Sequence, residues 1–266
     1  MVNLLTFMQI FDPMTYLKSL TKHIPNLITS VHLMMGCLSI VCAFQGKLIT
    51  ASVFIFIAGV LDFADGFAAR LLHAGSEFGK MLDSLCDAVS FGAAPSFIMF
   101  QLLSRTLFGG YIGCADNIGA ASFIELLILT SAFVIAVFSV LRLAKFNLDE
   151  RQTSYFVGVP TPANAFLIAS LPFVLAEYDV VASFLLRIYV LVPMIFILSF
   201  LLVAEIPMIS LKFKNLSLHD NRSRYLLLLI SLVLLIILKV SAYPVIFVIY
   251  IILSIVDSPK KSSGVL

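Results

Sequence analysis

Apolar stretches separated by short polar segments run along almost the whole chain. Most of these stretches contain about the 20 residues that an α-helix needs to cross the hydrocarbon core of a bilayer. The pattern predicts an all-α, polytopic integral membrane protein with about eight transmembrane helices. Their predicted ranges are 26–44, 48–70, 80–103, 122–143, 161–176, 183–204, 225–238 and 243–256.

The composition agrees with this pattern. The chain is 61% hydrophobic and 12% charged, whereas soluble proteins have roughly 45–50% apolar and about 25% charged residues. Polar residues interrupt positions 1–22 too often for a span, so we expect an amphipathic helix on the membrane surface there. Residues 23–266 are predicted to form a single transmembrane domain. The four cysteines have no C-x-x-C spacing, so we expect them to be packing residues.

The basic residues predict an orientation, because cytoplasmic loops of membrane proteins carry an excess of Lys and Arg. If the loop between the second and third helices is cytoplasmic, 13 of the 17 basic residues lie on that side and four lie outside. The thirteen are Lys18, Lys22, Arg70, Lys80, Arg142, Lys145, Arg151, Lys212, Lys214, Arg222, Arg224, Lys260 and Lys261. With eight spans, both termini are then cytoplasmic.

Four aspartates stand at the ends of the second and third predicted helices. Asp62 and Asp65 are three residues apart, and Asp83 and Asp87 are four apart, so each pair lies on one helical face. Because the two helices run in opposite directions, both pairs are expected at the same membrane face. Ionised groups at membrane depth are costly and usually functional. Four uncompensated anions would repel one another strongly, so we expect them to be partly protonated or to share a cation. Carboxylate oxygens in this number suit a hard divalent cation such as Mg²⁺ or Mn²⁺.

Small residues and an arginine accompany the aspartates. Gly66, Ala69 and Gly79 keep both helices slim, which leaves room for a ligand to approach the backbone closely. Arg70 offers a planar set of donors suited to phosphate, although it could also be a positive-inside anchor. Together with a metal, these residue types indicate a site for a phosphorylated substrate.

The spacing from Asp62 to Asp87 is D-x2-D-G-x2-A-R-x8-G-x3-D-x3-D. It resembles the signature of the CDP-alcohol phosphatidyltransferase family at every fixed position. Further segments resemble the bacterial CDP-diacylglycerol–serine O-phosphatidyltransferase branch, more loosely, between about residues 25 and 214. These segments are Ser84, residues 90–95 (SFGAAP), residues 142–147 (RLAKFN) and residues 158–163 (GVPTPA).

The resemblance implies a six-helix core over about residues 25–204, followed by two extra C-terminal helices. It implies a homodimer in the bacterial cytoplasmic membrane, with its active site facing the cytoplasm. The implied enzyme is a transferase acting in phospholipid biosynthesis. It moves a phosphatidyl group from CDP-diacylglycerol, drawn from the membrane lipid, to the hydroxyl of L-serine, and releases phosphatidylserine and CMP. No nucleic acid partner is expected.

The resemblance also implies roles for individual residues. Asp62, Asp65, Asp83 and Asp87 are expected to bind two divalent ions, Mg²⁺ or Mn²⁺, and Asp87 is expected to be the general base. The residues expected to contact nucleotide and phosphate are Asp65, Gly66, Ala69, Arg70, Gly79, Asn26 and Thr29.

The acceptor contacts must come from outside the common signature. The carboxylate of serine needs a cation near the metals, and Arg142 and Lys145 are the candidates, although both could equally be membrane anchors. Thr161 could add a hydroxyl contact. His32, in the first helix, is interpreted as a packed or hydrogen-bonded histidine, with a ligand role as the less favoured alternative.

Other functions fit parts of the pattern. A related transferase could use glycerol 3-phosphate or inositol, but a phosphorylated acceptor would need more cations near the metals. A divalent-cation transporter could also place carboxylates in the membrane, but its path should be polar through the full depth. A non-catalytic scaffold leaves the spacing of the aspartates unexplained.

Overall fold

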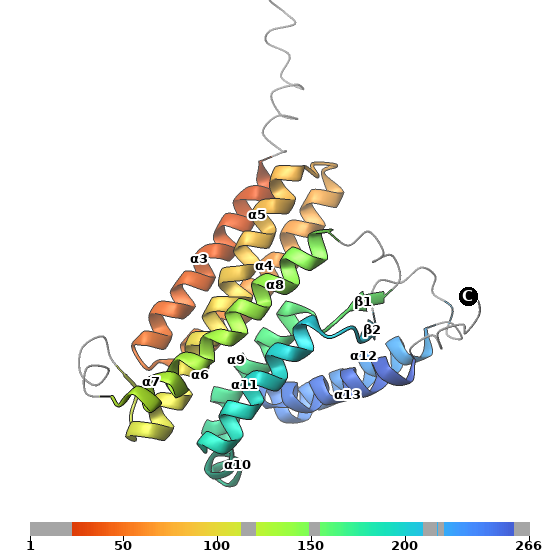
Figure 1. The fold of residues 1–266 in the computed structure, drawn as a ribbon. Helices are drawn as coiled ribbons and strands as arrows, with labels where there is room; N and C mark the ends of the chain where they lie inside the picture. The colour runs from red at the N-terminus through yellow and green to blue at the C-terminus, as the bar shows by residue number, and fades with distance from the viewer. Residues whose placement is uncertain (1–22, 113–120, 149–154, 210–216, 218–220, 258–266) are drawn as a thin grey trace, which may run out of the picture.

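The structure is a computed structural model that describes residues 23–112, 121–148, 155–209, 217 and 221–257. The surface helix expected over residues 1–22 lies outside this part of the chain. The described residues are helical apart from short connections and two three-residue strands (Figure 1). The predicted all-α, polytopic membrane class is therefore confirmed.

The first two helices form a hairpin. α3 (Ile24–Phe44) has Pro25 in its first turn, where the missing N–H of proline costs no helical hydrogen bond. Gly46, with φ of 72°, makes the tight turn into α4 (Leu48–Leu71). These bounds agree with the predicted helices 26–44 and 48–70 to within a few residues.

The third predicted helix is a long composite. It consists of α5 (Glu77–Asp87), the π-helical segment η1 (Ala88–Ala93) and α6 (Ala94–Phe108). The side chain of Ser76 accepts a hydrogen bond from the backbone N–H of Gly79 at 3.0 Å and so caps the start of α5. The predicted range was 80–103, so the helix includes five residues that the sequence had assigned to the following loop.

The C-terminal half contains shorter elements. They are α7 (Phe123–Thr130), the 3₁₀ turn η3 (Ser131–Phe133), α8 (Val134–Leu148), β1 (Tyr155–Val157), α9 (Thr161–Glu177), α10 (Asp179–Leu185), α11 (Ile188–Val203), β2 (Pro207–Ile209), α12 (Arg222–Leu238), the 3₁₀ turn η4 (Lys239–Ala242) and α13 (Tyr243–Val256). α3, α4, α6 and α8 run alongside one another, whereas α12 and α13 lie at an angle to them (Figure 1).

Two predicted helices differ from the observed ones. The fourth, expected over 122–143, is interrupted by η3 and then continues to Leu148. The sixth, expected as one helix over 183–204, is divided into α10 and α11 with a bend of 77° between them. The bend precedes Arg187, whose guanidinium donates to the carbonyl of Ser183 at 2.9 Å.

The number of spans can be compared with the prediction only in part. Within the described residues, five helical segments are long and apolar enough to cross a membrane, or six if α10 and α11 make one broken span. α9 is a shorter apolar helix of 17 residues. α12 and α13 form one apolar stretch in this count, but Lys239, with φ of 50°, separates them and they pack against each other. The total of eight stays a prediction.

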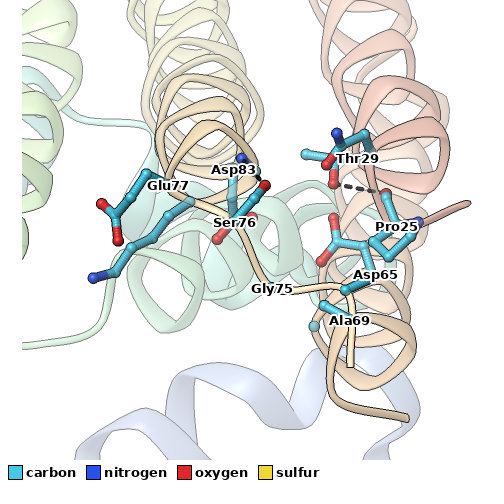
Figure 2. Close-up of a pocket in the computed structure, with 13 residues that line it drawn as sticks. Pro25, Thr29, Asp65, Ala69, Gly75, Ser76, Glu77 and Asp83 are labelled. Carbon is cyan, nitrogen blue, oxygen red and sulfur yellow. Dashed lines mark hydrogen bonds between the residues drawn. The ribbon is translucent and has the colours of Figure 1, made fainter. Parts of the chain in front are cut away.

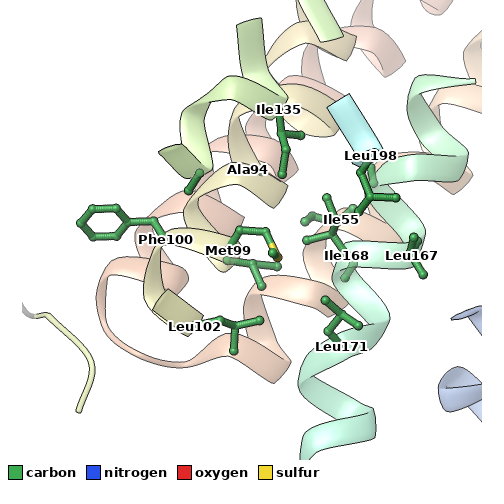
Figure 3. Close-up of a cluster of buried hydrophobic side chains, with 14 of the residues drawn as sticks. Ile55, Ala94, Met99, Phe100, Leu102, Ile135, Leu167, Ile168, Leu171 and Leu198 are labelled. Carbon is green, nitrogen blue, oxygen red and sulfur yellow. The ribbon is translucent and has the colours of Figure 1, made fainter. Parts of the chain in front are cut away.

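The hydrophobic core lies between α4, α6, α8, α9 and α11 (Figure 3). α6 is the central helix, because every residue from Ala94 to Ser104 except Phe97 is buried. A helix that is buried on all sides must satisfy its polar groups internally. Gln101 does so by exchanging two hydrogen bonds, of 2.9 and 3.0 Å, with the backbone of Ile112.

Large apolar side chains cover the outside of the bundle. Phe63 on α4 is 70% exposed, and Ile236 on α12 is 72% exposed. A protein in water rarely leaves such a continuous apolar surface uncovered. In a bilayer the same side chains face lipid, which agrees with the hydropathy of the helices.

The start of α9 is fixed by a close backbone contact with the end of α11. The N–H of Gly158 donates to the carbonyl of Ile206 at 2.9 Å, next to the antiparallel pair of β1 and β2. Gly158 has φ of 77°, and a Cβ there would lie 2.5 Å from the carbonyl oxygen of Leu202. Only glycine fits this position. The contact holds Thr161, three residues later, against the bundle.

Candidate active site

Four aspartates meet at one end of the bundle. Asp62 and Asp65 lie in the last turns of α4, and Asp83 and Asp87 lie on α5, of which Asp87 is the final residue. α4 and α5 are joined by a short linker and run in opposite directions, so both pairs lie at the same end (Figure 1). We call these four residues the carboxylate cluster.

The side chains of the carboxylate cluster are close enough to share a ligand. One oxygen from each of Asp62, Asp83 and Asp87 and one ring nitrogen of His32 all lie within 4.8 Å of one another. Asp65 is only 5% exposed and interacts electrostatically with the other three aspartates. The structure therefore groups three of the four predicted metal-binding residues with a histidine from α3, and Asp65 interacts with this group from outside it.

The cluster has the properties of a cation site. Asp65, Asp83 and Asp87 each have a buried carboxylate oxygen without a hydrogen-bond partner. In the described part of the chain, no lysine or arginine forms an ion pair with the cluster. Buried charges without partners are strongly unfavourable. These residues fit a divalent cation.

A pocket of about 520 Å³ lies beside the cluster. Thr29 and Asp65 stand on one side of it, and Ser76 and Asp83 stand on the other (Figure 2). Its lining includes six of the seven residues that the sequence assigned to nucleotide and phosphate, namely Asn26, Thr29, Asp65, Gly66, Ala69 and Gly79. The volume is within the range of about 300–1,000 Å³ typical of small-molecule sites.

The two pocket glycines that the sequence assigned to the nucleotide site, Gly66 and Gly79, have different surroundings. Nothing lies within 4 Å of the position that a Cβ would take at Gly66, so any side chain there would project into open space. At Gly79, a Cβ would lie 3.1 Å from Oδ1 of Asn26, so this glycine allows α5 to approach α3. Arg70, the seventh predicted residue, is exposed, and its Nε donates to the carbonyl of Gly66 at 3.0 Å.

A buried arginine lies on the inner side of the cluster. Arg142 on α8 is 8% exposed, and its Nη1 donates to Oγ1 of Thr161, at the start of α9, at 2.8 Å. Its guanidinium carbon lies 5.5 Å from the ring centroid of Phe146. Arg142 interacts electrostatically with Asp87, and its buried Nε has no hydrogen-bond partner. The Nε–H of Arg142 is therefore a buried hydrogen-bond donor that no protein group accepts.

The end of α8 is tied to its neighbours. Lys145 is half-exposed and lies 3.4 Å from a carboxylate oxygen of Glu205. Nδ2 of Asn147 donates to Oγ of Ser84 on α5 at 2.9 Å. These contacts hold the end of α8 against α5, the helix that carries Asp83 and Asp87, and against Glu205.

The sequence analysis favoured a packing role for His32, and the structure places its imidazole at the cluster. The signal was the helical spacing. Thr29, His32 and Gly36 follow one another at intervals of three and four residues, so they lie on one face of α3. Thr29 was already predicted to contact the nucleotide, which put His32 on the side of α3 that faces the site.

Comparison with known proteins agrees with this geometry. The family described as CDP-alcohol phosphatidyltransferase matches residues 22–205, which is well over half of the chain. The match includes the carboxylate cluster, the pocket and Arg142. It ends before α12 and α13, which lie beyond it.

Several relatives carry the name CDP-diacylglycerol–serine O-phosphatidyltransferase. The Bacillus subtilis protein is 33% identical over 152 residues, which are 57% of this chain and 76% of the relative. The protein of Helicobacter pylori strain J99 is 34% identical over 146 residues, 54% of each chain. The Methanocaldococcus jannaschii protein is 29% identical over 145 residues, 54% of this chain and 58% of the relative. This chain thus spans only about half the length of the latter two. By its family match and by its similarity to the Bacillus protein, the chain belongs to the CDP-alcohol phosphatidyltransferase family.

Proposed function

We propose that this protein transfers a phosphatidyl group from CDP-diacylglycerol to the hydroxyl of L-serine and produces phosphatidylserine and CMP. The observation that carries the choice of acceptor is the buried Arg142–Thr161 pair beside Asp87. The names of the relatives support the same assignment. The activity is that of an integral membrane enzyme, in agreement with the apolar helices.

The donor is held by the pocket between α3, α4 and α5. Its cytidine lies against the small residues Gly66, Ala69 and Gly79, and Asn26 and Thr29 supply polar contacts from α3. Arg70, at the exposed end of α4, lies outside the pocket lining and would contact the diphosphate only after releasing its hydrogen bond to the carbonyl of Gly66. The acyl chains remain in the bilayer, alongside the apolar outer surface of the helices.

The carboxylate cluster holds Mg²⁺ or Mn²⁺, and the resemblance implies two ions. When bound, the metal neutralises the diphosphate and acts as a Lewis acid on the reacting phosphoryl group. Asp62, Asp65, Asp83 and Asp87 supply the oxygen ligands. The three unpartnered buried carboxylate oxygens support this role.

Asp87 accepts the proton of the serine hydroxyl. The serine oxygen then forms a bond with the phosphorus that carries the diacylglycerol. The bond from that phosphorus to the bridging oxygen breaks, and the bridging oxygen leaves as part of CMP. A general base must reach the hydroxyl within hydrogen-bond distance, and the proximity of Arg142 to Asp87 supports this arrangement because a serine held by the arginine is then next to the base.

Arg142 binds the carboxylate of serine. A guanidinium can grip a carboxylate with two parallel hydrogen bonds, and the buried, unpartnered Nε of Arg142 is available for one of them. The contact with Thr161 fixes the plane of the guanidinium. Lys145, the second predicted contact, would have to leave Glu205 to reach the acceptor.

The alternatives fit the geometry less well. A glycerol 3-phosphate acceptor carries two negative charges and would need several cationic side chains near Asp87. Arg142 alone does not meet this need. A cation transporter needs a polar path through the membrane, but the side chains deeper in the bundle, such as Ile55, Phe91 and Ile98, are buried and apolar. The four aspartates of the carboxylate cluster lie together at one end of the bundle.

The acceptor is tested with purified protein in detergent, CDP-diacylglycerol and Mn²⁺ or Mg²⁺. Serine, glycerol 3-phosphate and inositol are supplied in turn, and CMP release is measured. We expect CMP release with serine and none above background with the other two. CMP release with glycerol 3-phosphate or inositol in place of serine would contradict the assignment.

Asp87→Asn removes the general base and leaves the shape of the side chain. We expect turnover with serine to fall by about 10²–10⁴-fold, while the protein stays folded and still binds CDP-diacylglycerol. Turnover is measured as CMP release, and folding by size-exclusion chromatography in detergent. Asp179→Asn, at an exposed carboxylate on α10, is the control and keeps wild-type turnover. Near-normal activity of Asp87→Asn would remove Asp87 as the base.

Arg142→Lys keeps the positive charge but loses the planar pair of donors. We expect the KM for serine to rise by about 10- to 100-fold, because a hydrogen bond to a charged group contributes about 1.5–3 kcal/mol. The KM for CDP-diacylglycerol should not change. Arg105→Lys, at an exposed arginine in the last turn of α6, is the matched control. A serine KM unaltered by Arg142→Lys in folded protein would exclude this contact, and Lys145→Ala then tests the second candidate.

We further propose that the protein lies in the bacterial cytoplasmic membrane with the carboxylate cluster and both termini facing the cytoplasm. The distribution of basic residues supports this orientation. If the C-terminus is cytoplasmic, green fluorescent protein fused to it should fluoresce. Alkaline phosphatase fused at the same place should be inactive. The reverse result would overturn the orientation. The homodimer implied by the resemblance stays a prediction.

A further inference from the structure

His32 lies outside the aspartate signature, on a different helix, and its environment is unusual for a histidine that only packs. The side chain is 0% exposed, and neither ring nitrogen has a hydrogen-bond partner. A buried polar group without a partner is unfavourable, and native proteins rarely retain one without a reason. One ring nitrogen lies within 4.8 Å of oxygens of Asp62, Asp83 and Asp87.

The surroundings hold the imidazole in this place. The ring of Phe91 packs against it with 5.1 Å between ring centroids. Oγ of Ser90 donates to the backbone carbonyl of His32 at 3.3 Å. α3 can approach this closely because position 36 is glycine, where a Cβ would lie 2.9 Å from Cα of Ser90. The backbone and one ring face are therefore fixed, and a nitrogen is directed at the aspartates.

We propose that His32 is a nitrogen ligand of the divalent metal bound by the carboxylate cluster. The inference rests on the proposed metal-dependent function and deepens it, because it adds a side chain from α3 to the ligands from α4 and α5. A metal ion would give the unpartnered nitrogen its missing interaction and would draw the three carboxylates and the imidazole together. Mg²⁺ is a hard cation that keeps oxygen ligands, so of the two candidate ions an imidazole contact favours Mn²⁺ at this position.

The test uses Mn²⁺ bound to the full chain in detergent, without nucleotide. Electron spin-echo envelope modulation detects a ¹⁴N nucleus coordinated to Mn²⁺, and we expect this modulation in the wild-type protein. His32→Gln should abolish it. It should also weaken Mn²⁺ binding by about tenfold or more, since even an outer partner of a metal ligand contributes about 10–100-fold to affinity.

A second variant answers the question even if His32→Gln does not fold. The chain has four histidines, at positions 23, 32, 73 and 219. The triple variant His23→Gln, His73→Gln, His219→Gln leaves His32 as the sole imidazole, and it should retain the ¹⁴N modulation of the wild type. Loss of the modulation in the triple variant, or its persistence in His32→Gln, would overturn the assignment.

The outcomes separate this inference from the proposed function. Bound Mn²⁺ without nitrogen modulation in the wild type would overturn the role of His32 and leave the aspartate site intact. Absence of Mn²⁺ binding would overturn both. Nitrogen modulation that depends on His32 alone supports the ligand role.

Discussion

Burial of carboxylates that lack partners is the constraint on which the site depends. Asp65, Asp83 and Asp87 each keep an unpartnered buried oxygen, and among the described residues no lysine or arginine forms an ion pair with them. In a low-dielectric environment such charges repel one another unless a cation lies between them. A divalent cation bound by the cluster would remove this repulsion.

The rest of the fold serves to hold three helices at this point. The α3–α4 hairpin and the α5–α6 composite bring their ends together, and α6 is buried on nearly all sides. η1, directly after Asp87, is a π-helical segment, a feature that occurs often at functional sites. The contacts of Gly158 then place Thr161 against Arg142. The pocket beside the cluster and the Arg142–Thr161 pair are thus fixed by different helices.

Much of this could be predicted from the sequence. Helix direction alone placed both aspartate pairs at one end, and the small residues at positions 66, 69 and 79 marked the pocket that the structure contains. The bend between α10 and α11 was missed, because apolar composition continues across it and gives no signal of direction. His32 was assigned to packing, because hydropathy cannot distinguish a buried histidine that packs from one that faces a ligand. The Arg142–Thr161 contact joins residues 19 positions apart on two helices, and only tertiary packing determines its distance.

The most direct test of the account is the location of the metal. Crystals of the protein grown with Mn²⁺, measured near the manganese absorption edge, give an anomalous signal at each bound ion. The account predicts an anomalous peak within coordination distance of Asp62, Asp83 and Asp87, where α4 and α5 meet. A well-ordered carboxylate cluster without such a peak, or with the manganese bound elsewhere on the chain, would contradict it.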